Sequence, residues 1–322
     1  MACLVLPRMR AARLHSIGGT LQLDNDVADP AARDGEVVVD LAYASVNPLD
    51  IWVTRGSPGA AAQNLPWTPG TEATGWLDGA PVLVRGGGLG VIRHGLYCER
   101  AAVPRTSVTA LPADADLRQV AGLGVAGATA WHAVHTKANV QRGDRVLVLG
   151  ASGGVGAMAV QLAKAAGAEV VGQTTSVTKV AGIVANGASR GVVADAAGLV
   201  SALDGFVPTV VFDALGGHFT NAAIDALDAF GRLVVYGTSV DEMVTINLRN
   251  LYRKGLVVSG YTGLRETPAE QGGLLATLIG QIASGALKVP IDEVFGLDGA
   301  AETHRRILER RVEGKLLLDC RA

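Results

Sequence analysis

The stretch Arg145-Val-Leu-Val-Leu-Gly-Ala-Ser-Gly-Gly-Val-Gly156 decides the fold of this chain. An apolar strand runs into a glycine-rich turn, and a helical pattern follows from Val155 to Ala166. Glycines lack Cβ atoms, so the backbone can approach a pyrophosphate, whose charge the N–H groups and dipole of the helix start favour. In this strand–turn–helix context the pattern predicts a dinucleotide site, although it could also be a tight turn that only packs helix on strand. The predicted contacts are Gly150, Ser152, Gly153, Gly154, Val155 and Gly156.

The next strand indicates which dinucleotide binds. A site for NAD usually has Asp or Glu at the end of this strand, where the carboxylate holds the ribose 2′-hydroxyl. Here the strand ends without an acid, and Glu169 precedes it and should point away from the ribose. Thr175, Ser176 and Lys179 follow the strand, and two hydroxyls with a cation suit a 2′-phosphate. The sequence therefore favours NADPH, with a solvated first-turn lysine as the alternative reading of Lys179.

Around the glycine turn, strands and helices alternate in a way that indicates βαβ units and a parallel sheet. The first third instead contains short strands with Gly/Pro turns, typical of a small barrel or sandwich. The final strand has no helix after it, so it is expected to return to the first domain. The expected strands are 36–45, 81–85, 97–103, 145–149, 169–173, 191–194, 209–213, 232–236, 255–261 and 315–318, and the expected helices are two within 117–137, then 155–166, 177–185, 218–230, 268–284 and 299–311.

Composition excludes several classes of protein. The formal net charge is −2 and there is no basic run, so nucleic acid is not an expected partner. No apolar run approaches the roughly 18 residues that a membrane span needs. Cys3, Cys98 and Cys320 are too far apart for a structural zinc site or a disulfide framework. We expect reduced thiols in a cytoplasmic protein.

Several further motifs accompany the glycine turn in a specific order and spacing. They are Ser45-Val-Asn-Pro-Leu-Asp50, Thr68-Pro-Gly-Thr-Glu72, Gly127-Ala-Thr-Ala-Trp131, Ala159-Val-Gln-Leu-Ala-Lys164, Val211-Phe-Asp-Ala-Leu-Gly-Gly217, Phe230-Gly-Arg-Leu-Val234 and Gly314-Lys-Leu-Leu-Leu318. With these motifs the chain resembles the zinc-independent quinone oxidoreductase (zeta-crystallin-like) branch of the medium-chain dehydrogenase/reductase superfamily.

The resemblance implies an α/β fold in two parts. A doubly wound parallel Rossmann sheet would occupy residues 123–258, and a β-rich GroES-like catalytic domain would combine residues 1–122 and 259–322. Because the usual beginning of the family matches Met9 onwards, residues 1–8 are expected to be an unpacked extension. The resemblance also implies a homodimer formed through the edge of the Rossmann sheet, around residues 233–240.

Zinc-dependent relatives place a cysteine near Asn47 and a histidine just before Glu72. This chain has Asn47 and Thr71 there, and neutral side chains of this kind cannot assemble a tetrahedral zinc site. Without a metal, we expect hydride transfer to an acceptor that needs little activation, chiefly through positioning and exclusion of water.

The family's cleft residues can be carried over by position. The resemblance puts Asn47 and Asp50 near the nicotinamide and substrate, although Asn47-Pro48 could be a plain turn. Thr129 would lie near the carboxamide, with a helix-start hydroxyl as the alternative. The remaining cleft residues would be Gly237, Gly260, Tyr261 and Thr262.

Three departures from the family pattern bear on the acceptor and the cofactor. The chain is short between Trp76 and Pro81, as if a hairpin were deleted, and an unusual glycine-rich loop follows at residues 85–95. Ala194 stands where the family has a tyrosine that stacks on adenine. His94 or Tyr97 could donate a proton to a reduced alkene or carbonyl, although a surface histidine and a packed tyrosine are the plainer readings. We therefore expect an NADPH-dependent quinone reductase, with an enoyl or enone reductase or a non-catalytic NADPH-binding protein as alternatives.

Overall fold

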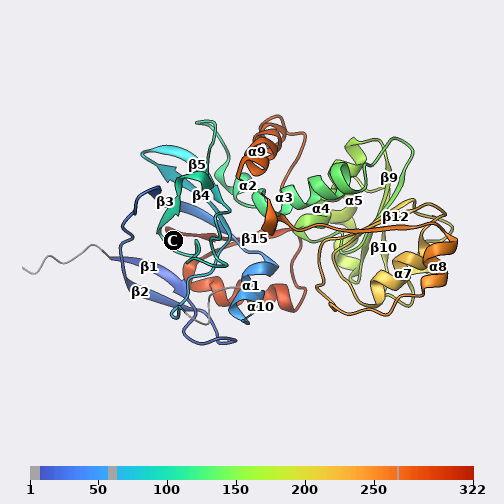
Figure 1. The fold of residues 1–322 in the computed structure, drawn as a ribbon, viewed down its shortest axis with the longest axis horizontal. Helices are drawn as coiled ribbons and strands as arrows, with labels where there is room; N and C mark the ends of the chain where they lie inside the picture. The colour runs from blue at the N-terminus through green and yellow to red at the C-terminus, as the bar shows by residue number, and fades with distance from the viewer. Residues whose placement is uncertain (1–7, 57–63, 267) are drawn as a thin grey trace, which may run out of the picture. The chain divides into compact units, whose positions relative to one another are not determined.

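A computed structural model describes residues 8–56, 64–266 and 268–322 of the chain (Figure 1). Its contacts divide the chain into two compact units, one made of Met1–Val125 with Glu266–Ala322 and the other of Ala126–Arg265. We call them the terminal unit and the central unit. The sequence had placed the boundaries after residues 122 and 258. The predicted extension at residues 1–8 lies outside the described residues except for Arg8, which begins a strand.

The central unit is built on a parallel sheet of six strands in the order β10-β9-β8-β11-β12-β13. This order places the first strand of the unit in the middle of the sheet, as in a doubly wound nucleotide-binding fold. The strands are β8 (Arg145–Val148), β9 (Glu169–Thr174), β10 (Arg190–Val193), β11 (Val210–Asp213), β12 (Arg232–Val235) and β13 (Val257–Gly260).

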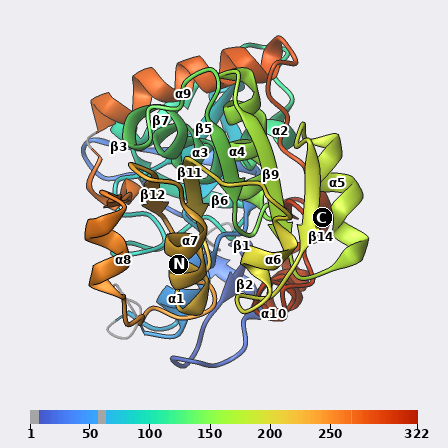
Figure 2. The same cartoon turned by 90° about the vertical axis from the view of Figure 1, so that its right-hand side faces the viewer.

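Helices cover both faces of this sheet. In β9, Val171 packs in one cluster with α6 and α7, whereas the next residue, Gly172, faces Ile183 of α5. Since successive strand residues point to opposite faces, these helices lie on opposite sides. Figure 2 shows α7 and α8 side by side. The helices are α3 (Gly124–Trp131), which continues as a π-turn (His132–Lys137), α4 (Gly154–Ala165), α5 (Val180–Ala185), α6 (Leu199–Ala202), α7 (His218–Ala226) and α8 (Leu248–Arg253), with short 3-10 turns at Val177–Lys179 and Gly263–Arg265.

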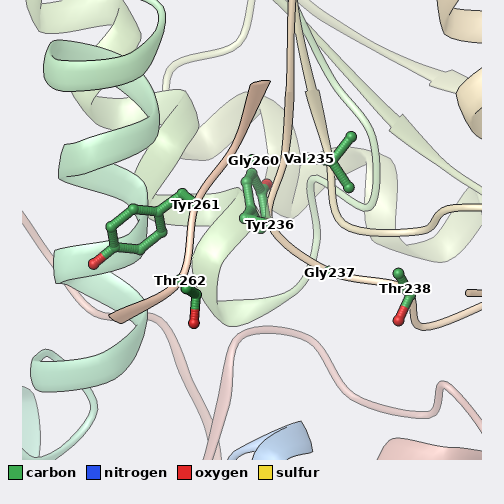
Figure 3. Close-up of a pocket in the computed structure, with 7 residues that line it drawn as sticks. All are labelled: Val235, Tyr236, Gly237, Thr238, Gly260, Tyr261 and Thr262. Atoms are coloured by element: carbon green, nitrogen blue, oxygen red, sulfur yellow. The ribbon is translucent and has the colours of Figure 1, made fainter. Parts of the chain in front are cut away.

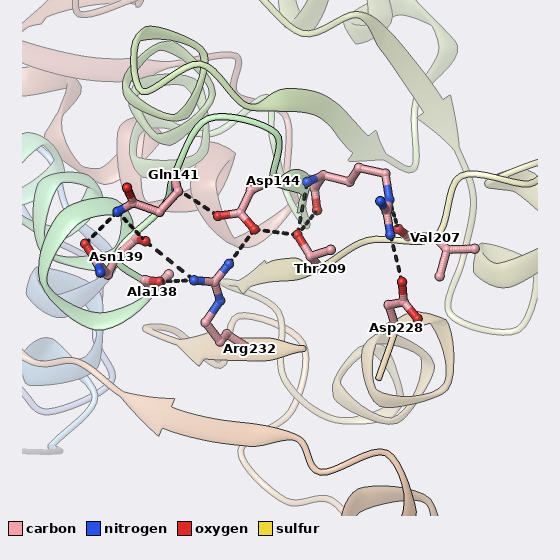
Figure 4. Close-up of polar contacts among 9 residues, drawn as sticks. Ala138, Asn139, Gln141, Asp144, Val207, Thr209, Asp228 and Arg232 are labelled. Atoms are coloured by element: carbon pink, nitrogen blue, oxygen red, sulfur yellow. Dashed lines mark hydrogen bonds and ion pairs between the residues drawn. The ribbon is translucent and has the colours of Figure 1, made fainter. Parts of the chain in front are cut away.

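A polar network joins the amino ends of the central strands (Figure 4). Asp144 accepts hydrogen bonds from the Thr209 hydroxyl at 2.7 Å and from the Arg232 guanidinium, while Arg145 pairs with Asp228 at 2.8 Å. Partial burial alone would raise the pKa of Asp144, but the hydrogen bonds from Gln141 N–H, Thr209 and Arg232 outweigh it and hold that pKa below its usual value. The network therefore stabilises the end of the sheet opposite to the glycine turn.

The terminal unit combines a mixed sheet with a two-stranded sheet, β1 and β2. The order of the larger sheet is β14-β15-β3-β4-β5-β7, with β6 paired to β3. The last strand, β15, pairs with β3, which confirms that the end of the chain returns to the first domain. The strands are β1 (Arg8–Arg13), β2 (Gln22–Ala28), β3 (Glu36–Ser45), β4 (Glu72–Leu77), β5 (Ala80–Arg85), β6 (Arg100–Pro104), β7 (Val108–Ala110), β14 (Ile291–Gly296) and β15 (Lys315–Asp319), and the helices are α1 (Pro48–Thr54), α2 (Leu117–Ala121), α9 (Pro268–Ala283) and α10 (Ala300–Leu308), with 3-10 turns at Arg105–Ser107 and Leu297–Gly299.

The apparent deletion before Pro81 is a tight hairpin. Asp78 and Gly79 connect β4 to β5 with φ angles of 51° and 82°, the left-handed pair that a two-residue turn requires. The following loop also depends on left-handed glycines, among them Gly90 at φ 73°. A Cβ at Gly90 would lie 2.6 Å from the carbonyl oxygen of Gly70, so this loop packs directly against the segment before β4.

Four local expectations were wrong. The predicted strand 97–103 begins only at Arg100, because the preceding residues pair with β1 through a bridge between Ala11 and Cys98. Asn47-Pro48 begins helix α1, with Pro48 at the first helical position, where its missing N–H costs nothing. Glu169 is the first residue of β9 and does not precede it. The edges of the sheet are β10 and β13, whereas β12, the expected place of the dimer contact, pairs on both sides.

Candidate functional site

The glycine turn lies at the carboxyl end of β8, the central strand of the central unit. Gly150 has φ 67°, and a Cβ at Gly156 would lie 2.4 Å from the Gly150 carbonyl oxygen, so only glycine permits this close crossing. Gly153 is the residue before α4, and no side chain caps the N–H groups of the first turn of α4. The first N–H groups of a helix have no partner within the helix itself. Ser152 and Val155 remain partly exposed. The turn can therefore receive a pyrophosphate, and its residues fit a dinucleotide.

The buried side chain of Gln173 holds this turn, and this role was not predicted from the sequence. The Gly150 N–H donates to Gln173 Oε1 at 3.0 Å, and Gln173 Nε2 donates to the Ala194 carbonyl at 2.6 Å. Gln173 is 1% exposed and follows the apolar residues Val170, Val171 and Gly172 in strand β9. Its position as a polar residue in that strand was the available signal.

The polar corner predicted for a 2′-phosphate follows the carboxyl end of β9. Thr175 is exposed and Ser176 is half-buried, with its hydroxyl 2.8 Å from that of Thr178. Lys179 ends the short 3-10 turn that begins at Val177. Glu169 lies at the amino end of the same strand, so its carboxylate is at the opposite end from this corner.

A cavity of about 410 Å³ lies at the carboxyl ends of β12 and β13 (Figure 3). Four predicted residues line it, and Val235, Tyr236 and Thr238 were not foreseen. The predicted ones are Gly237, Gly260, Tyr261 and Thr262. Burial, and secondarily the charge of Asp213, raises the pKa of Tyr236 well above its usual value. Among the described residues its buried hydroxyl has no hydrogen-bond partner.

Thr129 and Ala194 complete the predictions for the central unit. Thr129 lies inside α3, partly exposed, so it is not a helix-start hydroxyl. Ala194 directly follows β10 and is 8% exposed, and its carbonyl oxygen accepts the hydrogen bond from Gln173.

The terminal unit gathers a buried polar cluster around the start of α1. Asn47 Nδ2 donates to Thr71 Oγ1 at 3.2 Å and to Glu72 Oε1 at 3.0 Å. Lys315 Nζ donates to Asn47 Oδ1 at 2.6 Å and to the Val46 carbonyl at 2.9 Å. We define the buried polar cluster by its six side chains, which are all less than 9% exposed: Asn47, Asp50, Thr71, Glu72, Tyr97 and Lys315.

Asp50 and Tyr97 form the second half of this cluster. Asp50 Oδ2 accepts from the Asn47 N–H at 2.8 Å and from the Tyr97 hydroxyl at 3.0 Å. Burial raises the pKa of Asp50 to about 6, against the lowering effect of those hydrogen bonds and of Lys315. Burial also raises the pKa of Tyr97, with a further contribution from Asp50, and lowers that of Lys315. The cluster can therefore hold a proton on Asp50 near pH 6.

Of the four predicted catalytic residues, the structure brings three together and leaves His94 apart. His94 is exposed on the glycine-rich loop, where its ring lies 4.9 Å from that of Trp67 and its Nδ1 accepts from the Thr68 N–H at 3.3 Å. Partial burial of the His94 ring against its neighbours, followed by the charge of Arg13, lowers the pKa of His94.

Lys315 and Glu72 joined the cluster without having been predicted as site residues. The signal for Lys315 was a cation directly before three leucines at the start of a buried strand, a position that needs a polar partner.

The donor set of this cluster does not fit a zinc ion. The amide and hydroxyl of Asn47 and Thr71 are poor zinc ligands, and the Lys315 ammonium already occupies the amide oxygen. Nowhere in residues 8–56, 64–266 and 268–322 do three His, Cys, Asp or Glu side chains gather in a way that could hold a metal ion. The same ranges contain no helix long and apolar enough to cross a membrane.

A six-stranded doubly wound sheet with a glycine turn at its central strand defines a dinucleotide-binding protein. Comparison with known proteins narrows this class. Residues 154–278 match the family model described as "Zinc-binding dehydrogenase". The "Quinone oxidoreductase" of Homo sapiens is 28% identical over 323 residues, which cover 96% of this chain and 97% of that protein.

Solved structures of oxidoreductases are also similar to this chain in fold. The quinone oxidoreductase from Thermus thermophilus, which was also solved in complex with NADPH, has a TM-score of 0.82 at 28% identity and covers 97% of this chain and 100% of its own. An NAD-dependent alcohol dehydrogenase has a TM-score of 0.86 at 27% identity and covers 97% and 99%. These similarities support an oxidoreductase of the quinone oxidoreductase branch of the medium-chain dehydrogenase/reductase superfamily.

Proposed function

We propose that this chain is an NADPH-dependent oxidoreductase that transfers a hydride to a quinone-type acceptor without a metal ion. The observation that supports NADPH as the cofactor is the glycine turn together with the corner after β9, which has two hydroxyls and a cation but no acid. NADPH, when bound, supplies the hydride. The chain's own residues would hold the pyrophosphate at Gly153 to Gly156 and the 2′-phosphate at Thr175, Ser176 and Lys179.

The cofactor assignment is tested by replacing Lys179 with Glu. A charged hydrogen bond of this kind contributes about 1.5–3 kcal/mol, so NADPH should bind roughly 10- to 100-fold more weakly, while NADH affinity changes little. The matched control is Lys164→Glu, because Lys164 is an exposed lysine in the last turn of α4, away from that corner. Equal effects on both dinucleotides, or tighter NADH than NADPH binding by the wild type, would contradict the assignment.

The acceptor is tested by NADPH oxidation against quinones and α,β-unsaturated carbonyls. Turnover with quinones supports the proposal. Tight NADPH binding without turnover of any acceptor would instead favour a non-catalytic binding protein.

A second function, enone reduction, is favoured by the Tyr97–Asp50 pair, because that reaction needs a proton as well as a hydride. Asp50 holds a proton near pH 6 and accepts a hydrogen bond from Tyr97. If this pair supplies the proton, Tyr97→Phe should lower enone turnover and leave quinone turnover unchanged. Loss of both activities would point to a structural role for Tyr97.

Metal independence is supported by the donor set around Asn47 and by the Lys315 ammonium within it. Activity should survive a zinc chelator, and the purified protein should contain far less than one zinc per chain. Loss of activity with the chelator and recovery with zinc would overturn this part of the proposal.

We also propose that the chain forms a homodimer in which two copies of β13 meet. β13 is one of the two edge strands of the central sheet, and its Val257 and Val258 are 57% and 40% exposed. An open edge with apolar side chains favours pairing with another strand. Val258→Lys should convert the dimer into a monomer, as measured by light scattering. A wild-type protein that is monomeric in the same measurement would exclude the dimer.

A further inference from the structure

Helix α3, which precedes the glycine turn, ends in a π-turn whose first residue, His132, contacts Tyr261 of the cavity. α3 continues into the π-turn His132–Lys137, where the Ala138 N–H donates to the Ala133 carbonyl at 3.0 Å. Such widened turns are costly and are frequent at functional sites. His132 is the first residue of this turn, and its Nδ1 lies 3.0 Å from Thr136 Oγ1, a contact that fixes the orientation of the imidazole.

The imidazole of His132 stacks on the phenol ring of Tyr261. The ring centroids are 4.9 Å apart and the planes are inclined by only 21°. Tyr261 directly follows β13 and lines the cavity with Gly260 and Thr262. In Figure 3 its ring extends away from Tyr236 and towards the neighbouring helix, so the stack holds the ring at one side of the cavity.

This cavity lies on the nicotinamide side of the sheet if the cofactor binds as proposed. The glycine turn marks the middle of the sheet at β8, and the corner for the 2′-phosphate follows β9 on one side. The cavity lies at the ends of β12 and β13, on the other side of β8. A dinucleotide whose pyrophosphate lies at the turn therefore extends its adenosine towards β9 and its nicotinamide towards β12 and β13.

We propose that His132 is a positioning residue for the nicotinamide end of the cofactor, because its stack on Tyr261 fixes one wall of this cavity. His132 is not among the residues that line the cavity, so it acts through Tyr261. The inference rests on the proposed function, since it requires NADPH to bind at the glycine turn. Without the stack, the phenol ring gains freedom to rotate, and binding nicotinamide must order it again at an entropic cost.

The test compares two ligands by isothermal titration calorimetry: NADPH and 2′-phospho-ADP-ribose, which lacks the nicotinamide ring. His132→Ala should weaken NADPH binding about three- to tenfold, the equivalent of one aromatic pair, and leave 2′-phospho-ADP-ribose unchanged. His132→Phe keeps a ring that can stack and should restore the affinity. Tyr261→Leu removes the stack from the other side, and adding His132→Ala to it should have no further effect.

Equal weakening of both ligands, additive effects in the double variant, or wild-type NADPH affinity in His132→Ala would each overturn the inference. Unfolding midpoints of the variants separate a loss of fold from a loss of positioning, and His132→Phe provides a second variant at the same site. If the wild type itself bound no NADPH, the proposed function would fail. Wild-type NADPH binding that is insensitive to His132 would remove only this inference.

Discussion

Asp50→Asn perturbs the buried polar cluster at a carboxyl group whose negative charge is opposed by burial. The carboxyl is fully buried, and burial raises its pKa from 3.8 to about 6. A raised pKa means that the folded state binds this proton more tightly than the unfolded state. Its contribution to stability is therefore greatest below pH 4 and is lost as the pH rises from about 4 to about 6.

The size of this effect follows from the shift. About 2.2 pKa units, the difference between 6 and 3.8, correspond to roughly 3 kcal/mol of unfolding free energy at 1.36 kcal/mol per unit. Both hydrogen bonds to Asp50 end on the same oxygen, Oδ2, so an amide oxygen in that place can accept both. The variant should therefore keep the geometry while losing the pH dependence.

The assay is urea unfolding of the wild type and Asp50→Asn at several pH values from 4 to 8. The stability difference, variant minus wild type, should increase by about 2 kcal/mol across this range, because part of the effect already lies below pH 4 and because other carboxyl groups cancel in the difference. Asp26→Asn is the matched control for the same substitution at the surface, since its carboxylate is 75% exposed. A flat curve for Asp50→Asn would refute the reasoning, because Asp50 would then ionise at its ordinary pKa in the folded protein.

Three further predictions concern single residues. Lys315→Met should lower the unfolding free energy at neutral pH by about 3–5 kcal/mol, because it leaves buried acceptors and a carboxylate without their cation; a loss below 1 kcal/mol in urea unfolding would contradict this. Phe230 has φ 60° and is 83% exposed, so Phe230→Gly should raise stability by about 0.5–1 kcal/mol, with a lower thermal midpoint as the contrary result. Gly156→Ala should abolish dinucleotide binding in calorimetry, whereas Gly153→Ala, whose Cβ would meet its nearest neighbour only at 3.5 Å, should preserve the fold; the idea fails if both variants bind like the wild type.

The sequence was sufficient where the chemistry is local. The glycine turn, the helix after it and the alternation of strands and helices depend on contacts between neighbours in the chain. The strands of the central unit were predicted within a few residues, although the short helices α6 and α8 were not predicted. The Asp78-Gly79 hairpin was missed as a turn, although its chemistry is equally local, because the shortness of the segment suggested a deletion.

The buried polar cluster shows what needed the tertiary structure. Lys315 and Asn47 are 268 positions apart, and their contact exists only because β15 returns to pair with β3. Sequence spacing carries no information on such a pairing, since strand register is set by packing across the whole sheet. For the same reason the sequence placed Asn47, Asp50 and Tyr97 near a site by resemblance but could not show that their polar groups bind one another.

The sequence by itself determined that this chain forms a nucleotide-binding sheet with a glycine turn, because strand, turn and helix are encoded within a dozen neighbouring residues. Only the tertiary structure decided that Lys315 enters the cluster around Asn47, that Gln173 holds the turn, and that His132 stacks on Tyr261. These contacts join residues from separate strands and helices. Their energies depend on burial and distance, which the folded chain alone defines.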